Sequence, residues 1–371
     1  MTEINTILPS EKRQINPSTC PPPNGGGPCS GLTLRPAEGG VERVKAVGLL
    51  SGGLDSALAA RIVRDLGIEV HGLYFAMPWG CCDKSKAQAA AESLGIKFMV
   101  LQLDERYLEV VKKPKYGYGS ALNPCVDCRI HMFSRAQKYM TAVGAEFVFT
   151  GEVLGQRPMS QMRQSMRAIE KGSNLEGRLL RPLCAQFLDP TVPEKEGLVD
   201  REKLLDLSGR SRSRQMELAK QYGISDYLPP AGGCLLTDKN FARRMKDTFE
   251  HGYRNFRETI ALKWGRHFRI SPDFKAILGR DEEENGSLRA FAHPDDHTFE
   301  LPDKRGPTLV LKGYFPSEDI LSAAAGLVQR FSRHKEAESV EVEYWLVRHK
   351  NQIKRIQSRR LSEEEIARMQ I

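Results

Sequence analysis

The apolar positions along the chain follow two spacings in turn, and these spacings predict alternating strands and helices. A run of apolar residues at 44–50 predicts a strand. After a short polar segment, apolar residues recur every four positions, as on one face of an amphipathic helix. Those residues are Leu54, Leu58, Ile62 and Leu66. The first two elements are therefore a strand and a helix that follows it directly.

The same alternation continues to about residue 183. Strands are predicted at 68–75, 98–103, 147–150 and 179–183, and helices at 87–94 and 130–143. Strands that alternate with helices pair in parallel, and their ligands bind at the carboxyl ends of the strands. We therefore predict a doubly wound parallel sheet of the α/β class over residues 41–240.

The pattern differs on both sides of this region. Residues 1–40 contain few large apolar residues, together with runs of proline and glycine, and are predicted to be a disordered tail. Residues 241–371 mix short strand-like runs with a helix-like stretch at 317–331, which predicts a second, smaller α+β domain. The acidic block at 281–284 is interpreted as a solvated face or a helix start.

The net charge and the cysteines narrow the class of protein. The 371 residues carry a formal charge of +8. A basic balance favours a polyanionic partner, although an ordinary soluble enzyme can also be basic. No run of 18 apolar residues and no apolar signal region is present, so we expect a cytoplasmic protein without a membrane partner. Eight cysteines in such a chain favour metal binding or catalysis over disulfides.

The polar segment between the first strand and the first helix reads Ser51-Gly52-Gly53-Leu54-Asp55-Ser56. Its two glycines let the backbone approach a phosphate, and the N-terminus of the following helix attracts negative charge. The two serines add hydroxyl donors, and the aspartate fits either an N-cap or a Mg²⁺ ligand. An ordinary strand-to-helix turn is the alternative. The complete pattern after a strand favours a nucleotide site.

Three cysteines form a second candidate site. Cys125 and Cys128 have the C-x-x-C spacing that lets two sulfurs bind one ion or cluster, and they precede the predicted helix at 130–143. Cys234 ends a loop rich in proline and glycine. Three cysteines without an obvious fourth ligand suit a 4Fe-4S cluster with one open iron. A zinc site with another ligand, a catalytic or persulfide-carrying pair, and a structural role stay open.

The remaining cysteines are expected to play no part in this site. We interpret them as incidental, in the tail, or as packed thiols in the first domain. They are Cys20, Cys29, Cys81, Cys82 and Cys184. The adjacent pair at 81–82 has the alternative of approaching the same pocket.

The segment at 51–56 resembles the PP-loop of the ATP pyrophosphatases, which cleave ATP between the α and β phosphates and adenylate a substrate. It lacks the lysine that closes a Walker A loop, and it lacks the G-x-G-x-x-G of a Rossmann fingerprint. The resemblance implies an adenine nucleotide alpha hydrolase-like fold that binds ATP with Mg²⁺. It also implies that Ser51, Gly52, Gly53, Asp55 and Ser56 hold the phosphates.

A longer resemblance covers residues 44–236. The segments at 125–129 and 150–156, with Ser160-Gln161 and Arg181-Pro182-Leu183, are similar to those of the ThiI-type tRNA 4-thiouridine synthases. This implies that Thr150, Gly151 and Glu152 close the nucleotide pocket. It also implies that Gln156 and Arg157 reach the α-phosphate or the RNA backbone. For Glu152, a salt bridge to a basic neighbour is the alternative.

The three-cysteine pattern further resembles the iron–sulfur thiouridine synthases of the same superfamily. That resemblance implies that the 4Fe-4S cluster is held by three metal ligands, which also act in catalysis together with Asp55. Those ligands are Cys125, Cys128 and Cys234.

The chain departs from these families in two ways. We expect no N-terminal RNA-binding THUMP region, because the residues before 44 leave no room for one, and no rhodanese domain with a catalytic cysteine, because no cysteine follows Cys234. Sulfur would come from the cluster, from free sulfide or from a cysteine desulfurase relay. The C-terminal part resembles an RNA-binding module of NFACT-type proteins, and basic clusters at 157–167, 210–214 and 354–360 are interpreted as phosphate contacts or solvated faces.

Together the resemblances imply an ATP-dependent tRNA sulfurtransferase. Such an enzyme adenylates a uridine carbonyl and replaces its oxygen with sulfur, with 4-thiouridine as the first choice of product and 2-thiouridine as the second. tRNA is the implied partner, and a homodimer is a further expectation. Two rival hypotheses remain: a PP-loop enzyme that adenylates a small molecule for thio- or amide-group transfer, and a non-enzymatic RNA-binding or iron–sulfur protein.

Overall fold

A computed structural model describes residues 43–77, 79–80, 83–227, 233–253 and 255–371. The predicted tail at 1–40 lies outside these residues, and so do Cys20, Cys29, Cys81 and Cys82. Most of the loop before Cys234 also lies outside them.

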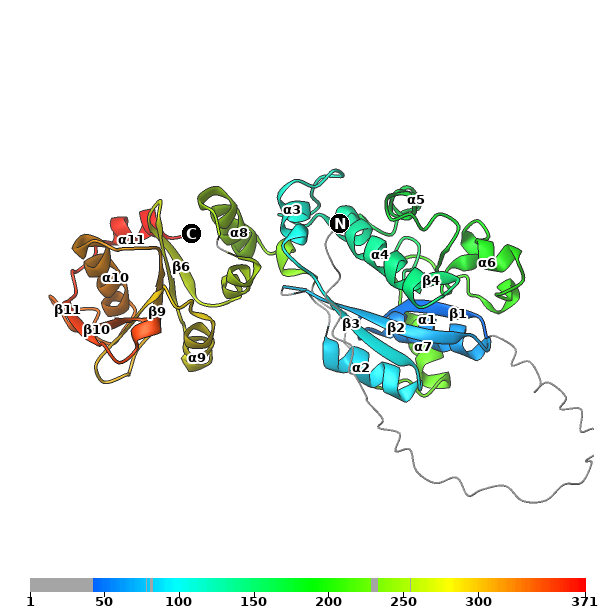
Figure 1. Cartoon of the computed structure of the whole chain (residues 1–371), viewed down its shortest axis with the longest axis horizontal. Helices are drawn as coiled ribbons and strands as arrows, with labels where there is room; N and C mark the ends of the chain where they lie inside the picture. The colour runs from blue at the N-terminus through cyan, green and yellow to red at the C-terminus, as the bar shows by residue number, and fades with distance from the viewer. Residues whose placement is uncertain (1–42, 78, 81–82, 228–232, 254) are drawn as a thin grey trace, which may run out of the picture. The chain divides into compact units, whose positions relative to one another are not determined.

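The first part of the chain is built on a five-stranded parallel sheet (Figure 1). The strands are β1 (Lys45–Leu49), β2 (Glu69–Ala76), β3 (Lys97–Gln102), β4 (Phe147–Thr150) and β5 (Leu179–Leu180). Their order is β3-β2-β1-β4-β5, and every neighbouring pair is parallel. The predicted α/β class and parallel sheet are confirmed.

Helices cover both faces of this sheet, as in a doubly wound fold (Figure 1). One core includes residues of α1 (Leu54–Asp65), α2 (Lys84–Ser93) and α7 (Ser213–Gln221). The opposite core includes residues of α3 (Arg106–Lys112), α4 (Cys125–Ala142), α5 (Arg163–Gly172) and α8 (Lys239–His251). Shorter helices occupy the connections: α6 (Val192–Lys195), η1 (Ala185–Phe187), η2 (Arg201–Lys203), η3 (Leu235–Thr237) and η4 (Phe256–Lys263).

The strand order reverses between β1 and β4, and this point positions the candidate site. Leu49 at the end of β1 pairs with Thr150 at the end of β4, so the loops after the two strands lie side by side. A Cβ atom on Gly151 would lie 2.4 Å from the backbone carbonyl of Asp55. Only glycine permits this approach. Ligands bind at such switch points in open α/β sheets.

Helix α4 begins earlier than the periodicity predicts. The pattern places its start near residue 130, whereas the structure starts it at Cys125, where the N–H of Cys128 bonds to the carbonyl of Pro124 at 2.8 Å. Proline is favoured at helix starts, where its missing N–H is not needed. Both cysteines of the C-x-x-C motif therefore lie in the first turn of α4.

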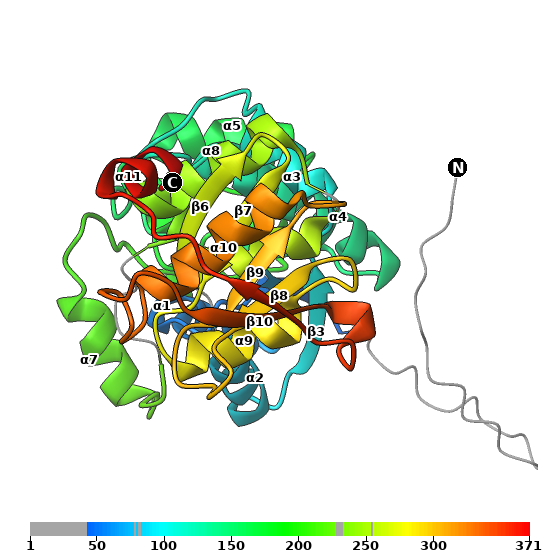
Figure 2. The same cartoon turned by 90° about the vertical axis from the view of Figure 1, so that its left-hand side faces the viewer.

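The second sheet has six strands in the order β11-β10-β8-β9-β7-β6, all antiparallel to their neighbours. They are β6 (Arg266–Ser271), β7 (Phe274–Leu278), β8 (His297–Glu300), β9 (Leu309–Lys312), β10 (Glu341–Leu346) and β11 (Lys354–Gln357). Helix α10 (Glu318–Arg330) crosses one face of the sheet and shares its apolar core (Figure 2). The remaining elements are α9 (Glu282–Phe291), α11 (Glu363–Met369) and η5 (Val347–His349). The predicted α+β class of this part is confirmed.

The acidic block at 281–284 is a helix start. Asp281 caps α9, because its side chain accepts a hydrogen bond of 2.9 Å from the N–H of Glu284. Carboxylates in a first turn also interact favourably with the helix dipole.

Helix α8 belongs to the packing of both sheets. Phe241, Ala242 and Met245 lie in the core on one face of the parallel sheet. Asp247, on the same helix, forms ion pairs with Arg269 and Lys275 of the antiparallel sheet at 2.7 and 2.8 Å. The predicted boundary at 240/241 therefore falls just after this helix begins, and it stays a prediction.

Among the described residues, no helix is both long and apolar enough to cross a membrane.

Candidate functional site

The loop after β1 is arranged as an open anion site. Helix α1 begins after Gly53, and no described side chain caps its first turn. Gly52 has a φ of +79°, in the left-handed region that favours glycine. The hydroxyls of Ser51 and Ser56 lie 3.2 Å apart, and Ser56 donates to the carbonyl of Gly53 at 2.8 Å. The uncapped N–H groups of α1 therefore face the loop, as a phosphate site requires.

Asp55 points one carboxylate oxygen into this site without a partner. Its Oδ1 atom is buried and makes no hydrogen bond to the described residues, while Oδ2 accepts a bond of 3.1 Å from Nε2 of Gln156. Burial raises the pKa of Asp55, and the nearby charges of Arg212 and Arg157 only partly offset the rise. An unpartnered buried carboxylate oxygen is the kind of ligand that Mg²⁺ takes, so these residues fit a magnesium–nucleotide group.

The structure adds Arg212 to this site, which the sequence placed only in a basic cluster. The loop after β4 pairs with a later loop, where the N–H of Gly209 bonds to the carbonyl of Leu154 at 2.8 Å. This pairing brings Arg212 close to Asp55. The Nε atom of Arg212 is buried and has no hydrogen-bond partner among the described residues. One carboxylate oxygen of Asp55 and one guanidinium nitrogen of the nearby Arg212 thus lack hydrogen-bond partners among the described residues, as expected for a site that binds a charged ligand.

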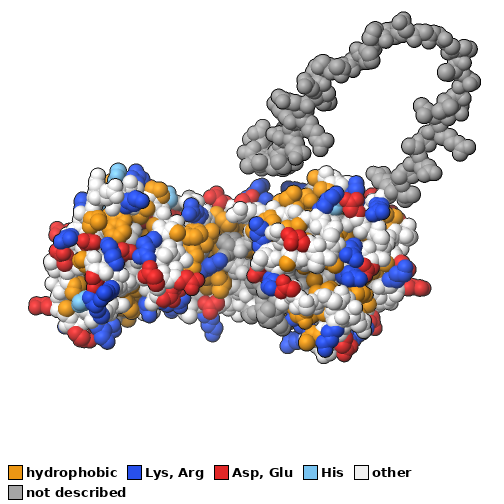
Figure 3. Space-filling model, turned by 90° about the horizontal axis from the view of Figure 1, so that it is seen from below, with side chains coloured by type: hydrophobic (Ala, Val, Ile, Leu, Met, Phe, Trp, Pro, Cys, Tyr) orange, Lys and Arg blue, Asp and Glu red, His pale blue; other side chains and the backbone are white. Residues whose placement is uncertain are grey.

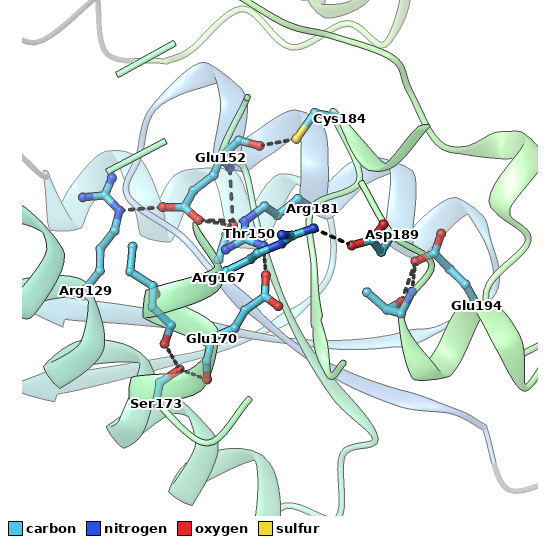
Figure 4. Close-up of polar contacts among 12 residues, drawn as sticks. Arg129, Thr150, Glu152, Arg167, Glu170, Ser173, Arg181, Cys184, Asp189 and Glu194 are labelled. Atoms are coloured by element: carbon cyan, nitrogen blue, oxygen red, sulfur yellow. Dashed lines mark hydrogen bonds and ion pairs between the residues drawn. The ribbon is translucent and has the colours of Figure 1, made fainter. Parts of the chain in front are cut away.

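Glu152 forms the centre of a buried ion-pair network (Figure 4). Its carboxylate accepts from Arg129 at 2.5 Å and from Arg181 at 3.0 Å, and Arg181 also pairs with Glu170. Burial alone would raise the pKa of Glu152, but the two guanidinium groups outweigh burial and lower it. Glu152 is 5% exposed, so its position agrees with the salt-bridge alternative rather than with direct contact to a nucleotide.

Arg129 connects this network to the cysteines. Its Nη1 atom donates to Sγ of Cys125 at 3.3 Å, while its Nε atom holds Glu152. A positive charge beside a sulfur stabilises the thiolate, which is both the nucleophile and the metal ligand. Arg129 appeared in the sequence only as the residue after the C-x-x-C motif. Its spacing of four from Cys125 on one helix is the signal that indicates the contact.

The three candidate cysteines lie around one buried phenol. The hydroxyl of Tyr107 lies 3.1 Å from Sγ of Cys128. Burial, and then the charges of Cys128, Cys234 and Cys125, raise the pKa of Tyr107 well above its usual range. Cys128 and Cys234 belong to the same apolar core. The structure therefore brings the three sulfurs to one neighbourhood, although residues as far apart as 128 and 234 supply them.

The chemistry of the three cysteines suits a metal cluster, whereas the spacing of the described side chains does not match a metal-ion site. Three thiols next to an arginine are suitable donors for a thiolate-held cluster. Within the described part of the chain, however, no three His, Cys, Asp or Glu side chains are spaced to hold a metal ion. Cys184 is fully buried and donates to the carbonyl of Glu152 at 3.4 Å, as the expectation of a packed thiol requires.

The comparisons with known proteins divide the chain in the same way as the two sheets. Residues 41–188 match the family model described as "Thiamine biosynthesis protein (ThiI)". Residues 265–369 match the model described as "NFACT protein RNA binding domain". We name these two parts of the chain the ThiI-type domain and the NFACT-type domain, after the models to which they are similar. Both resemblances drawn from the sequence are confirmed.

Individual relatives resemble the ThiI-type domain. The tRNA-specific 2-thiouridylase MnmA of Sulfurimonas denitrificans is 36% identical over 113 residues, which are 28% of this chain and 33% of that protein. MnmA of Clostridioides difficile is 26% identical over 245 residues, which are 59% of this chain and 63% of that protein. The chain thus spans about a third of the length of the first of these relatives.

Solved structures give weaker matches. A 4-thiouridine synthetase in complex with RNA and bound ATP is 20% identical, with a TM-score of 0.38, over 55% of this chain and 50% of that one. This similarity is too low to support an argument about function. The features of the ThiI-type domain described above rest on its own residues.

Proposed function

We propose that this protein is an ATP-dependent tRNA sulfurtransferase. The single observation that carries the proposal is the unpartnered carboxylate oxygen of Asp55 in the uncapped PP-loop at the sheet's switch point. The matches to the two family models and the similarity to tRNA-specific 2-thiouridylases support the substrate class. In this proposal the ThiI-type domain performs the chemistry, and the NFACT-type domain contributes RNA binding.

The first step of the proposed reaction activates the uridine. Its carbonyl oxygen attacks the α phosphorus of ATP, the bond between the α and β phosphates breaks, and pyrophosphate leaves. The uncapped first turn of α1 would hold the phosphates and Asp55 would hold Mg²⁺, while Gln156 fixes the Asp55 carboxylate by a hydrogen bond. The unpaired Nε of Arg212 supplies a positive charge where negative charge develops. A poor leaving oxygen thereby becomes part of AMP.

The second step replaces the oxygen. A sulfide attacks the activated carbon, the carbon–oxygen bond breaks, AMP leaves with the oxygen, and the sulfur loses its proton. We propose that Cys125, Cys128 and Cys234 hold the 4Fe-4S cluster, which when bound supplies the iron site for the incoming sulfur. Arg129 donates a hydrogen bond to the sulfur of Cys125, and the hydroxyl of Tyr107 lies within hydrogen-bond distance of the sulfur of Cys128. A persulfide on one cysteine of the pair Cys125 and Cys128 is the alternative sulfur source. Its outer sulfur would attack the activated carbon and displace AMP, and the thiol of the other cysteine would then break the S–S bond and form a disulfide between the two cysteines.

RNA contacts are proposed for both domains. On the face of the molecule shown in Figure 3, basic and acidic side chains are interspersed. In the predicted cluster at 354–360, Arg355 pairs with Glu341 and Glu343, and Arg359 pairs with Glu365. Both arginines are exposed, and ion pairs at the protein surface are weak, so these arginines can exchange a carboxylate for a phosphate. Lys354 has no ion-pair partner among the described residues.

The product within the class is the finer part of the proposal. We propose 4-thiouridine first, as the ThiI match suggests, and 2-thiouridine second, as the names of the MnmA relatives suggest. A separate sulfur donor protein and a homodimer stay predictions.

The proposal is tested by following both products of one reaction. Full-length protein is incubated anaerobically with tRNA, Mg²⁺, α-labelled ATP and ³⁵S-sulfide. We expect label in AMP and ³⁵S in tRNA, both dependent on tRNA and both lost in Asp55→Asn. ADP as the nucleotide product would contradict the PP-loop assignment. AMP release without tRNA but with a small acceptor would support the small-molecule rival instead.

A further inference from the structure

A cavity that no PP-loop residue lines has Arg181 among its lining residues. It has a volume of about 240 Å³. Helix α5, the loop after β5 and the short helix α6 line it, and Arg181 is one of its lining residues. Figure 4 shows the polar contacts of Arg181. Pockets for drug-sized ligands measure roughly 300–1,000 Å³. This cavity therefore suits a single small group rather than a whole nucleotide.

Arg181 has one nitrogen left over for a ligand. The residue is 2% exposed, its Nε atom donates to Glu152 and its Nη1 atom to Glu170. Its Nη2 atom is buried and has no hydrogen-bond partner among the described residues. A buried N–H of a charged group without a partner is unfavourable, so a bound acceptor would satisfy it. Nothing in the proposed adenylation uses this nitrogen.

The acidic side chains of the cavity are already engaged. Glu170 pairs with Arg181, Glu194 pairs with Arg201, and Asp189 pairs with Arg167 at 3.2 Å. Glu194 also accepts hydrogen bonds from Thr191 at the start of α6. The carboxylates are therefore held by the protein's own donors, and they do not supply the missing acceptor.

Two cations of the cavity have no such partner. Arg163 and Lys195 line it, both are exposed, and neither forms an ion pair with a described residue. Together with Arg181 they place three cationic side chains along the lining of one small cavity. A guanidinium edge with added positive charge binds oxyanions, and it binds phosphate especially well.

We propose that this cavity binds a phosphate group, held by Nη2 of Arg181 with Arg163 and Lys195 at its mouth. The group comes either from the RNA backbone or from a free phosphate ion. The first source rests on the proposed function, because it needs RNA to reach the ThiI-type domain. Arg181 also holds Glu152, so a phosphate here would lie one residue away from the Glu152–Arg129–Cys125 connection.

The test uses the double variant Arg163→Gln/Lys195→Gln in the full chain. Both side chains are exposed, so the fold should persist, as circular dichroism will check. The matched control is Lys138→Gln/Lys220→Gln, which removes two exposed and unpaired lysines elsewhere on the ThiI-type domain. Filter binding measures tRNA affinity at about 0.1 M salt, and titration calorimetry measures inorganic phosphate. We expect the double variant to bind either tRNA or inorganic phosphate about tenfold more weakly than the control does, because charge-assisted hydrogen bonds are lost.

The two binding measurements distinguish the RNA backbone from a free phosphate ion as the source of the phosphate group. Weaker tRNA binding with unchanged phosphate binding identifies the RNA backbone, and the reverse identifies the free ion. Equal affinities of the double variant and the control for both ligands would overturn the proposal. Arg181→Lys keeps the charge but removes the second donor edge, and it should weaken the same ligand. Neither binding measurement requires sulfur transfer, so a failure of the proposed function would be seen separately, as absent ³⁵S in tRNA.

Discussion

At the scale of single residues, Glu152 shows how a motif position can be predicted correctly while its partners are not. Its place after β4 follows from the sequence. Its two guanidinium partners come from positions 129 and 181, and only the fold brings these together. Buried ion pairs are costly to break, because removing one partner leaves the other charge uncompensated.

Replacing Glu152 with glutamine should therefore lower the free energy of unfolding by about 3 kcal/mol. The folded-state pKa of Glu152 lies below its ordinary value of 4.5, so the ion pairs contribute fully above pH 4.5. Their contribution is lost as the pH falls through the lowered pKa. Denaturant unfolding of both proteins between pH 7 and pH 3 should show a difference that is constant above pH 4.5 and shrinks below it.

The control for this measurement is Glu146→Gln. Glu146 forms an exposed pair with Arg178 at 3.6 Å, and exposed pairs contribute about 0–1 kcal/mol. A similar loss of stability in both variants would show that the Glu152 network contributes no more than a surface pair.

The cysteines should differ in reactivity, because they differ in burial and charge. Cys125 is half-buried beside Arg129, whereas Cys184 is fully buried, and burial raises the pKa of its thiol to about 11. In metal-free native protein near pH 8, iodoacetamide should label Cys125 well before Cys184, as peptide mass spectrometry can determine. In denaturant the two should react alike. Equal labelling of both in the native protein would contradict the described packing.

At the scale of elements, the contact between the loop after β4 and the first turn of α1 shapes the nucleotide site. Gly151 approaches the backbone of Asp55 so closely that a methyl group would overlap it. Gly151→Ala should therefore displace the first turn of α1 and weaken ATP binding at least tenfold, since overpacking costs about 1–3 kcal/mol. Equilibrium dialysis with labelled ATP measures this.

Gly144→Ala is the matched control for Gly151→Ala. Gly144 ends α4 with a φ of +64°, and a Cβ there would meet no atom within 4 Å. Its substitution should lower stability by about 1 kcal/mol through backbone strain and leave ATP affinity unchanged. If both variants bind ATP like the wild type, the loop does not shape the site.

The elements also show what a sequence can and cannot predict. The strand at 147–150 and the helix after the PP-loop agree with the structure, because apolar runs and four-residue spacing are local signals. The start of α4 at Cys125 differs from the prediction. The first turn contains polar and cysteine residues, which do not show the apolar spacing of a helix. Helices α3, α5, α7 and α8 were not predicted. Polar residues outnumber the few apolar residues in these segments, so the apolar spacing of a helix is not recognisable in the sequence. Their apolar residues are buried by elements that lie far away in the chain.

The candidate site likewise contains residues that the sequence predicts and residues that only the fold brings to it. The PP-loop is one continuous segment, so it could be predicted from the sequence alone. The same holds for the cysteine pair at 125 and 128. The roles of Arg212 and Tyr107 could not, because each reaches the site through a tertiary contact and neither carries a motif.

At the scale of the whole molecule, the basic balance and the NFACT-type domain predict salt-sensitive binding of tRNA. Each phosphate contact lowers the logarithm of affinity by about 0.7–0.9 per tenfold rise in salt. About four contacts would therefore cost about tenfold for each doubling of salt. Filter binding of labelled tRNA at several salt concentrations measures the slope. ATP binding, measured alongside, should change much less. A flat slope for tRNA would favour the small-molecule rival.

The central claim is that the protein places sulfur on a tRNA uridine in an ATP-dependent reaction. Mass spectrometry of tRNA nucleosides tests it most directly, in a strain that lacks the gene and carries either the wild-type protein or Asp55→Asn. We expect one thiouridine, 4-thiouridine first, to be missing in the deletion strain, to return with the wild-type gene and to stay missing with Asp55→Asn. An unchanged set of thiolated nucleosides in all three strains would contradict the account.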